Sequence, residues 1–256
     1  MADFKEIKKR IKSVSDTIKI TNAMYLIAST KLSRSRRELN NMMPYVDFVK
    51  NNIGKMFEAK TDGKTAYLFI TSEKGFAGTF NQNIFKSIEK ILCKENDDTL
   101  FVTGECGSRY FISHSQREIT YIKLENVLVH IKKLCSDEPE VSVHILYSDM
   151  HGKIKDEVIA PISYKMNCEI EYYPSFEEVS KMATEEYVSV MFDYILKESY
   201  CAEQYARMAA MNIAKNNAQK ILEKLNREYN RMRQNAITSE ITEISSEKIR
   251  KHIAGS

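Results

Sequence analysis

The chain has 256 residues, of which 43% are hydrophobic and 29% are charged, so it can bury a core while much of its surface faces water. No apolar run approaches the ~20 residues that cross a bilayer, and Asp3, Lys5 and Glu6 stand where a signal peptide needs apolar residues. The five cysteines are scattered and form no C-x-x-C pair, which argues against a disulfide framework or a zinc site and predicts a reducing, cytosolic compartment.

Residues 1–44 are predicted to form one long helix with an apolar seam. Spacings of three and four residues separate Phe4, Ile7, Ile11, Val14, Ile18, Thr21, Tyr25, Ala28 and Leu32. This is a heptad repeat, and neither Pro nor Gly interrupts it before Pro44. At 1.5 Å per residue the helix would reach on the order of 55 Å, so it needs a partner along its length.

Residues 45–175 show a different period and are predicted to form an inserted, Rossmann-like α/β domain. Apolar, β-branched or aromatic runs typical of strands occur at 66–71, 100–103, 119–124 and 141–147. Three of these runs are followed by helix-like stretches at 81–92, 106–113 and 125–134. Strands that alternate with helices indicate β-α-β units around a mainly parallel sheet.

Residues 176–256 are predicted to form a second long helix. No Pro or Gly occurs between Pro174 and Gly255, and apolar or small residues recur at spacings of three and four. One helix of this length would reach roughly 100 Å, which exceeds the span of a single globular domain. The predicted fold is therefore α/β plus coiled coil: a long antiparallel two-helix coiled coil of the first and last helices, with the α/β domain inserted between them.

The segment from Ile70 to Gly78 is the best candidate for chemistry in the middle domain, because two glycines follow a strand and precede a helix. It lacks the spacing of a phosphate loop or a dinucleotide fingerprint, so a tight turn is the favoured interpretation over a phosphate cradle. The five histidines show no metal-ligand spacing, and no nucleophile elbow frames Ser72. We expect no catalytic residue, no cofactor and no metal.

Three blocks of sequence carry a resemblance to a known family. The first block contains Ile11-Lys12-Ser13-Val14, Thr17, Lys19-Ile20-Thr21, Ala23-Met24, Ala28 and Lys31-Leu32. The second contains Glu203-Gln204, Ala206-Arg207-Met208, Ala210-Met211, Asn217-Ala218, Tyr229-Asn230, Arg233-Gln234, Ile237-Thr238, Glu240-Ile241 and Glu243-Ile244. The third is the loop from Thr71 to Gly78. Together they resemble the gamma subunit of the F-type, proton-translocating ATP synthase.

The resemblance implies a central rotor shaft that couples ion flow through a membrane ring to ATP synthesis or hydrolysis. Its implied partners are the alpha and beta subunits as a hexamer, the epsilon subunit and the ring of c subunits, while catalysis belongs to beta. The implied contacts to alpha and beta are Met24, Arg233, Gln234, Thr238 and Glu240. The implied location is peripheral, on the cytoplasmic face of the bacterial plasma membrane, with membrane association through the c-ring only.

Two other classes remain open from the residues alone. Residues 1–37 and 200–233 are rich in Lys and Arg, so a basic coiled-coil nucleic-acid-binding or adaptor protein is the alternative. Acidic residues such as Glu6, Asp16 and Glu223 interrupt the basic stripes, which disfavours duplex binding. A phosphate-binding enzyme would rest only on Gly75 and Gly78.

Overall fold

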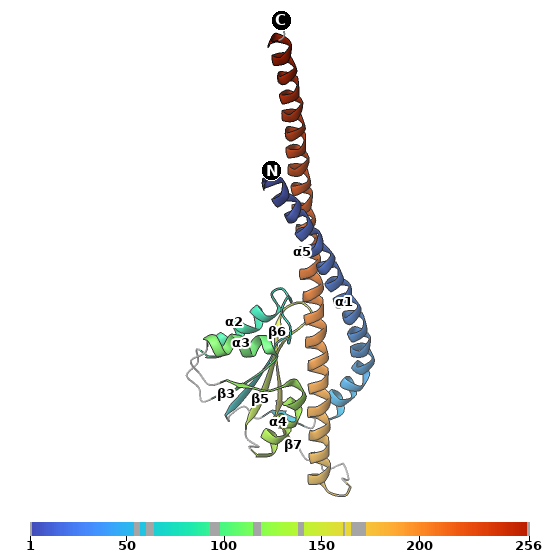
Figure 1. Ribbon diagram of the computed structural model, residues 1–256. Helices are drawn as coiled ribbons and strands as arrows, with labels where there is room; N and C mark the ends of the chain where they lie inside the picture. Colours follow the sequence, from blue (N-terminus) through green and yellow to red (C-terminus); the bar gives the residue numbers. More distant parts are fainter. Residues whose placement is uncertain are drawn as a thin grey trace. The chain divides into compact units, whose positions relative to one another are not determined.

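The computed structural model describes residues 2–53, 57–59, 64–92, 98–114, 119–137, 141–160, 162–164 and 173–254. In chain order the elements are α1 (Ala2–Asn52), β1 (Phe57–Ala59), β2 (Thr65–Ile70), α2 (Phe80–Leu92), β3 (Thr99–Thr103), α3 (Glu105–His114), β4 (Thr120–Tyr121), α4 (Leu124–Asp137), β5 (Ser142–Ser148), β6 (Ile154–Ala160), β7 (Ile162–Tyr164) and α5 (Phe176–Ala254) (Figure 1). Two long helices and a set of alternating strands and helices were predicted, and these features are confirmed.

The chain forms two compact units, and each is described by itself. Residues 27–210 make up the larger unit, which contains the strands and the shorter helices. Residues 1–26 and 211–256 make up the smaller unit, which contains the beginning of α1 and the end of α5. No helix within the described ranges is long and apolar enough to cross a membrane.

The larger unit is built on a five-stranded sheet with the order β4-β3-β2-β5-β6. The first four strands are parallel to their neighbours, whereas β6 pairs with β5 in the antiparallel direction. The parallel strands were predicted from their apolar runs. Strand β6 was not, because charges at Lys155, Asp156 and Glu157 obscure its apolar pattern, as is common at the edge of a sheet.

Successive side chains of each strand point to opposite faces of the sheet, and each face packs into its own hydrophobic core. On one face, Phe69, Leu100 and Leu146 pack with the buried residues of α2 and α3. On the other face, Leu68 and Ile145 pack with buried residues of α1, α4 and α5. Because successive strand residues point to opposite faces, the near-continuous apolar runs of the parallel strands fill both cores. The layers are visible in Figure 1.

Helix α1 extends further than the sequence suggests, because it passes through Pro44 and ends at Asn52. Proline lacks the N–H that would bond to the carbonyl four residues earlier, and its ring crowds that carbonyl. Val46 and Val49 lie beyond the proline and are almost fully buried in the core beside the sheet. Their burial explains why the helix continues, since tertiary packing overrides local propensity.

In the smaller unit the beginning of α1 lies along the end of α5 in the antiparallel direction. Phe4 contacts Tyr229 through its ring, and the Lys215 Nζ donates a hydrogen bond to the Asn22 Oδ1 over 2.8 Å. As residue numbers rise on α1, those of the partners on α5 fall. Thr21, Met211 and Ala218 are buried in this unit, whereas residues 233–246 of α5 are exposed.

Candidate functional site

The predicted contact residues fall at two places in the smaller unit. Arg233, Gln234, Thr238 and Glu240 lie within two turns of α5, and all four are exposed. Met24 is half-buried on α1, two residues beyond Asn22, which pairs with Lys215. About twenty residues of α5 separate that point from Arg233, which is roughly 30 Å along a helix. The structure therefore gathers four of the five predicted residues and leaves Met24 apart.

Two threonine hydroxyls at the end of α5 bond to the backbone of their own helix. The Thr238 hydroxyl donates to the Gln234 carbonyl over 2.9 Å, and the Thr242 hydroxyl donates to the Thr238 carbonyl over 2.8 Å. Each hydroxyl therefore has its donor engaged by the carbonyl one turn earlier in the helix. Arg233 and Glu240 extend from the same segment as exposed charges of opposite sign.

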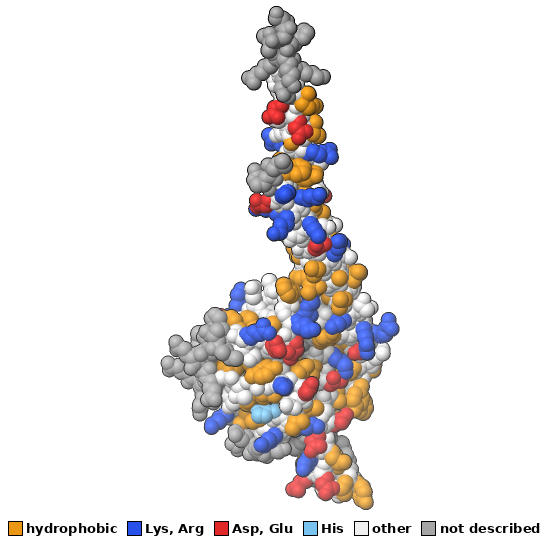
Figure 2. All heavy atoms as spheres, in the orientation of Figure 1, with side chains coloured by type: hydrophobic (Ala, Val, Ile, Leu, Met, Phe, Trp, Pro, Cys, Tyr) orange, Lys and Arg blue, Asp and Glu red, His pale blue; other side chains and the backbone are white. Residues whose placement is uncertain are grey.

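An apolar stripe follows the same end of the helix. Ile237, Ile241 and Ile244 are spaced by four and three residues, so they share one face, and they are 47%, 62% and 59% exposed. Figure 2 shows hydrophobic side chains interleaved with charged ones along this end of α5. Exposed isoleucines in a continuous row indicate contact with another chain, because such a surface is unfavourable in water.

The segment from Thr71 to Gly78 lies at the carboxyl end of β2, and its polar groups are satisfied within the protein. The Thr71 hydroxyl donates to the Thr103 carbonyl over 2.7 Å and accepts from the Gly107 amide over 3.0 Å. The Cys106 amide donates to the Ser72 carbonyl over 3.1 Å. The helix that follows this segment is α2, and at its start the Phe80 amide donates to the Ala77 carbonyl over 3.1 Å, while the Ser72 amide donates to the Asn81 Oδ1 over 3.1 Å. Both amides are already engaged, so the tight-turn interpretation is favoured over a phosphate cradle.

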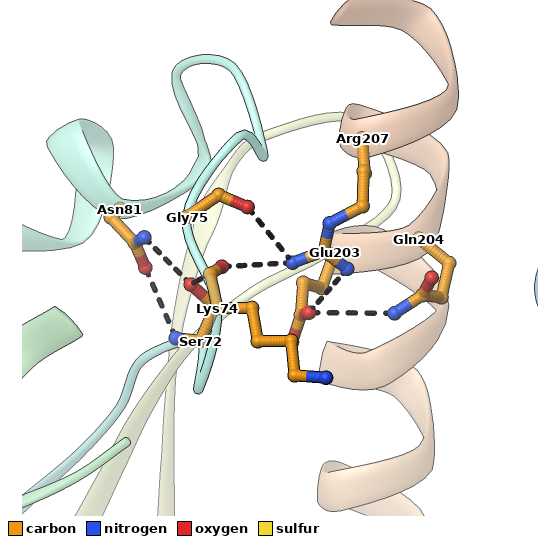
Figure 3. A network of polar contacts seen from close by, with 7 residues as sticks. All are labelled: Ser72, Lys74, Gly75, Asn81, Glu203, Gln204 and Arg207. Atoms are coloured by element: carbon orange, nitrogen blue, oxygen red, sulfur yellow. Dashed lines mark hydrogen bonds and ion pairs between the residues drawn. The ribbon is translucent and has the colours of Figure 1, made fainter. Parts of the chain in front are cut away.

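Arg207 on α5 holds this loop in place (Figure 3). Its guanidinium donates to the carbonyl of Lys74 over 2.9 Å and forms an ion pair with Glu203 at 2.6 Å, one turn earlier on the helix. Burial raises the pKa of the Glu203 carboxyl, and the nearby Arg207 offsets only part of that effect. At the tip of the loop, Phe76 has φ 64° and a side chain that is 72% exposed. A bulky residue rarely adopts this conformation.

Sequence reasoning missed a second polar cluster in the larger unit. The carboxylate of Glu198 on α5 accepts a hydrogen bond from the Tyr147 hydroxyl on β5 over 2.9 Å. It also forms an ion pair with Lys155 on β6 at 2.5 Å. The three residues stand far apart in the sequence, and no local pattern marks them. A glutamate at an inward-facing position of a predicted helix was the one signal available.

Other polar side chains of the described ranges form pairs rather than sites. No three His, Cys, Asp or Glu side chains in those ranges lie together as metal ligands would. His144 pairs with Asp156 at 2.9 Å, and the Cys201 sulfur lies 3.0 Å from the Ser35 hydroxyl in the interior. Cys93, Cys135 and Cys168 lie outside the residues whose side chains are described.

Comparison with known proteins gives consistent matches over nearly the whole chain. The family model described as ATP synthase (ATP-synt) matches residues 3–247. The ATP synthase gamma chain of Acetivibrio thermocellus is 34% identical over 288 aligned positions, covering 95% of this chain and 97% of that protein. The ATP synthase gamma chain of Symbiobacterium thermophilum is 30% identical, covering 94% and 95%.

Solved structures with a similar fold come from mitochondrial ATP synthases. A chain of the Euglena gracilis OSCP/F1/c-ring assembly in rotational state 3 has a TM-score of 0.75 at 14% identity, covering 100% of this chain and 96% of that one. A chain of the Tetrahymena thermophila central stalk and c-ring has a TM-score of 0.61 at 19% identity, covering 76% and 99%. At such low identity these matches concern the fold.

Proposed function

Because the chain belongs to the ATP synthase gamma-chain family, we propose that it is the central rotor shaft that couples ion flow to ATP synthesis or hydrolysis at catalytic beta subunits. The proposal rests on one observation above all. The last part of α5 is a bare helix with a row of exposed isoleucines, in a chain whose relatives named as gamma chains match it almost from end to end. A shaft needs such a helix, since its surface must contact surrounding subunits in turn.

The shaft has three segments in this proposal: residues 1–44, residues 45–175 and residues 176–256. The first and third form an antiparallel coiled coil, supported by the contacts of Phe4 with Tyr229 and of Asn22 with Lys215. The middle segment is a Rossmann-like domain, supported by four parallel strands with helices between them. The chain itself is non-catalytic, and its role is mechanical.

The proposed partners are the hexamer of alpha and beta subunits, the epsilon subunit and the c-ring. Two of the matched structures are described as assemblies that include a c-ring, which supports contact with that ring in this protein too. Membrane association then occurs only through the c-ring, on the cytoplasmic face of the bacterial plasma membrane. A nucleic-acid-binding or adaptor role is not favoured, because the family match covers both long helices.

The exposed end of α5 supplies the proposed contacts to alpha and beta. Arg233 and Gln234 can donate hydrogen bonds to carboxylate or carbonyl oxygens of the surrounding loops, and Glu240 can accept them. Thr238 keeps its hydroxyl on the helix, so it presents its methyl group and a free lone pair. Met24 is proposed to contact beta separately, near the pair of Asn22 and Lys215 and away from the end of α5. As the shaft turns, these groups exchange partners and favour different states of the beta subunits.

Co-expression with the alpha and beta subunits of the same organism tests the proposal. We expect native mass determination to find three alpha, three beta and one copy of this chain, with ATP turnover that depends on the chain. A chain that stays apart from alpha and beta, and leaves their turnover unaffected, would overturn the proposal.

A further inference from the structure

A buried carboxylate joins the sheet to a long helix in the larger unit. Glu198 on α5 is only 8% exposed, yet it carries an ionisable group. It accepts the hydrogen bond from the fully buried Tyr147 on β5, the strand next to the edge of the sheet, and it forms an ion pair with Lys155 on the edge strand β6. One carboxylate on α5 thus binds two adjacent strands.

The same cluster extends to the first long helix. Tyr194 lies one turn before Glu198 on α5, where burial and then the negative charge of Glu198 raise the pKa of its hydroxyl. The Lys50 ammonium of α1 lies 5.1 Å from the centre of the Tyr194 ring, within cation–π range. The cluster of Tyr147, Lys155, Tyr194, Glu198 and Lys50 therefore connects β5, β6, α5 and α1.

The two tyrosines of the cluster remain hydrogen-bond donors over the physiological range. Burial raises the pKa of the Tyr147 hydroxyl first, and the negative charge of Glu198 raises it further. The same two causes raise the pKa of the Tyr194 hydroxyl. Both hydroxyls therefore keep their protons, and the Tyr147 hydroxyl donates its proton to the Glu198 carboxylate.

The need to hold α5 on the sheet does not by itself explain a buried charge at Glu198. Val188, Met191 and Ile195 of α5 already pack against the sheet in the apolar core. Replacing a buried ion pair with apolar residues of similar size is often neutral or stabilising, so the charge is weak evidence for a stabilising role. Hydrogen bonds differ from apolar contacts in being directional, and they weaken steeply as distance and angle change.

The hydrophobic attraction that holds an apolar helix on a sheet is non-directional and follows the buried area, so it does not by itself select one register of the helix on the sheet. A hydrogen-bonded carboxylate fixes one point of the helix to one point of the sheet. We infer that Glu198 is a positioning residue for torque transfer, which with Tyr147 and Lys155 prevents α5 from sliding on the sheet while the shaft turns under load. This inference rests on the proposed function as a rotor shaft.

The test uses the complete enzyme, with its membrane sector, reconstituted in lipid vesicles. Two quantities are measured together: the rate of ATP hydrolysis, and the electrical potential that hydrolysis builds up, reported by a voltage-sensitive dye. The variants are Glu198→Leu, Glu198→Gln and Tyr147→Phe. The matched control is Glu185→Gln, since Glu185 is exposed on the same helix.

We expect Glu198→Leu to lower the potential per ATP hydrolysed at least twofold while the complex assembles and hydrolyses ATP. Glu198→Gln restores part of the ratio because its amide oxygen still accepts from Tyr147, and Tyr147→Phe causes a smaller loss in the same direction. Glu185→Gln leaves the ratio unchanged. A residue that only stabilises the fold would lower the melting temperature and yield without changing this ratio in assembled complexes.

An unchanged ratio in the assembled Glu198→Leu complex would overturn the inference. If that variant does not assemble, an unchanged ratio for Tyr147→Phe overturns it instead, because phenylalanine keeps the shape of the ring. Failure of the proposed function gives a different result. In that case the unaltered chain does not activate ATP hydrolysis by alpha and beta at all.

Discussion

The ring of Phe4 on α1 lies 4.6 Å from the ring of Tyr229 on α5, with a tilt of 32° between their planes. The contact lies near the beginning of α1, and the exposed part of α5 begins within two turns of it, at residue 233. The aromatic pair thus lies near the point where α5 continues without a partner helix.

Phe4→Ala is expected to open the end of the helix pair locally. An aromatic pair contributes about 0.5–1.5 kcal/mol beyond the area that it buries. Hydrogen exchange of α5 amides around Tyr229 should therefore speed up, while amides around Cys201 in the larger unit keep their protection. Ile20→Ala serves as the control because Ile20 is 59% exposed. Equal exchange in Phe4→Ala and the unaltered chain would contradict the prediction.

Gly107→Ala is predicted to destabilise the larger unit. A Cβ at this position would lie 2.6 Å from the hydroxyl of Thr71, which follows β2, and 2.6 Å from a methyl of Val102 within β3. Such overpacking costs about 1–3 kcal/mol. Urea unfolding of Gly107→Ala should show that loss of stability.

Gly75→Ala supplies the matched control in the neighbouring loop. A Cβ there meets no atom within 4 Å, so the free energy of unfolding should change by less than about 0.5 kcal/mol. If the two alanine variants unfold at the same urea concentration, the close packing around Gly107 does not limit stability.

Much of the fold was predictable because it depends on local pattern. The runs at 66–71, 100–103 and 141–147 coincide with β2, β3 and β5 within one residue, since parallel strands buried on both faces are continuously apolar. The second long helix was also predicted, because no residue between Pro174 and Gly255 can break it. The pattern of apolar residues and the positions of Pro and Gly were sufficient to predict these elements.

Features that depend on distant residues were not predictable. Helix α1 passes Pro44 because Val46 and Val49 are buried against elements that follow much later in the chain. The bond between Tyr147 and Glu198 joins residues 51 positions apart, and neither residue has a neighbour that marks it. The contacts proposed for Arg233 and Glu240 rest on the family resemblance alone, since their exposure resembles that of any surface charge.

Glu203 predicts a distinct pH dependence of stability. Burial raises the pKa of its carboxyl above the ordinary value of 4.5, so the folded state binds the proton more tightly than the unfolded state. The contribution of this group to stability is therefore greatest below pH 4.5 and declines as the pH rises from there through the folded-state pKa. Above that pKa the contribution no longer changes.

Glu203→Gln should abolish this contribution. Unfolding free energies measured in urea at several pH values from 4 upward give the difference between the unaltered chain and the variant, and that difference should fall as the pH rises. Glu223→Gln is the control, because the Glu223 side chain is 69% exposed in its pair with Arg227. A difference that rises with pH would mean that the ion pair with Arg207 outweighs the effect of burial.

The double substitution Arg233→Ala and Gln234→Ala tests the proposed contacts at the end of α5. Both side chains are exposed and neither packs in the core, so the melting temperature of the chain should stay the same. In the assembled complex, however, the hydrogen bonds that they donate to the surrounding subunits would be lost. A hydrogen bond to a charged group contributes about 1.5–3 kcal/mol, so the loss of one such bond corresponds to a roughly tenfold or larger change in an equilibrium or rate constant.

ATP turnover of the purified complex of alpha, beta and this chain is the measurement, and we expect the double variant to lower it by about tenfold. Arg231→Ala is the matched control, since it removes an equally exposed arginine two residues earlier on another side of the helix. Equal turnover in the double variant and the unaltered complex would show that torque passes through other residues, and the apolar stripe of Ile237, Ile241 and Ile244 would be the next surface to test. A loss of turnover in Arg231→Ala as large as in the double variant would instead point to the total positive charge of the segment, because a specific contact depends on which side of the helix carries the donor.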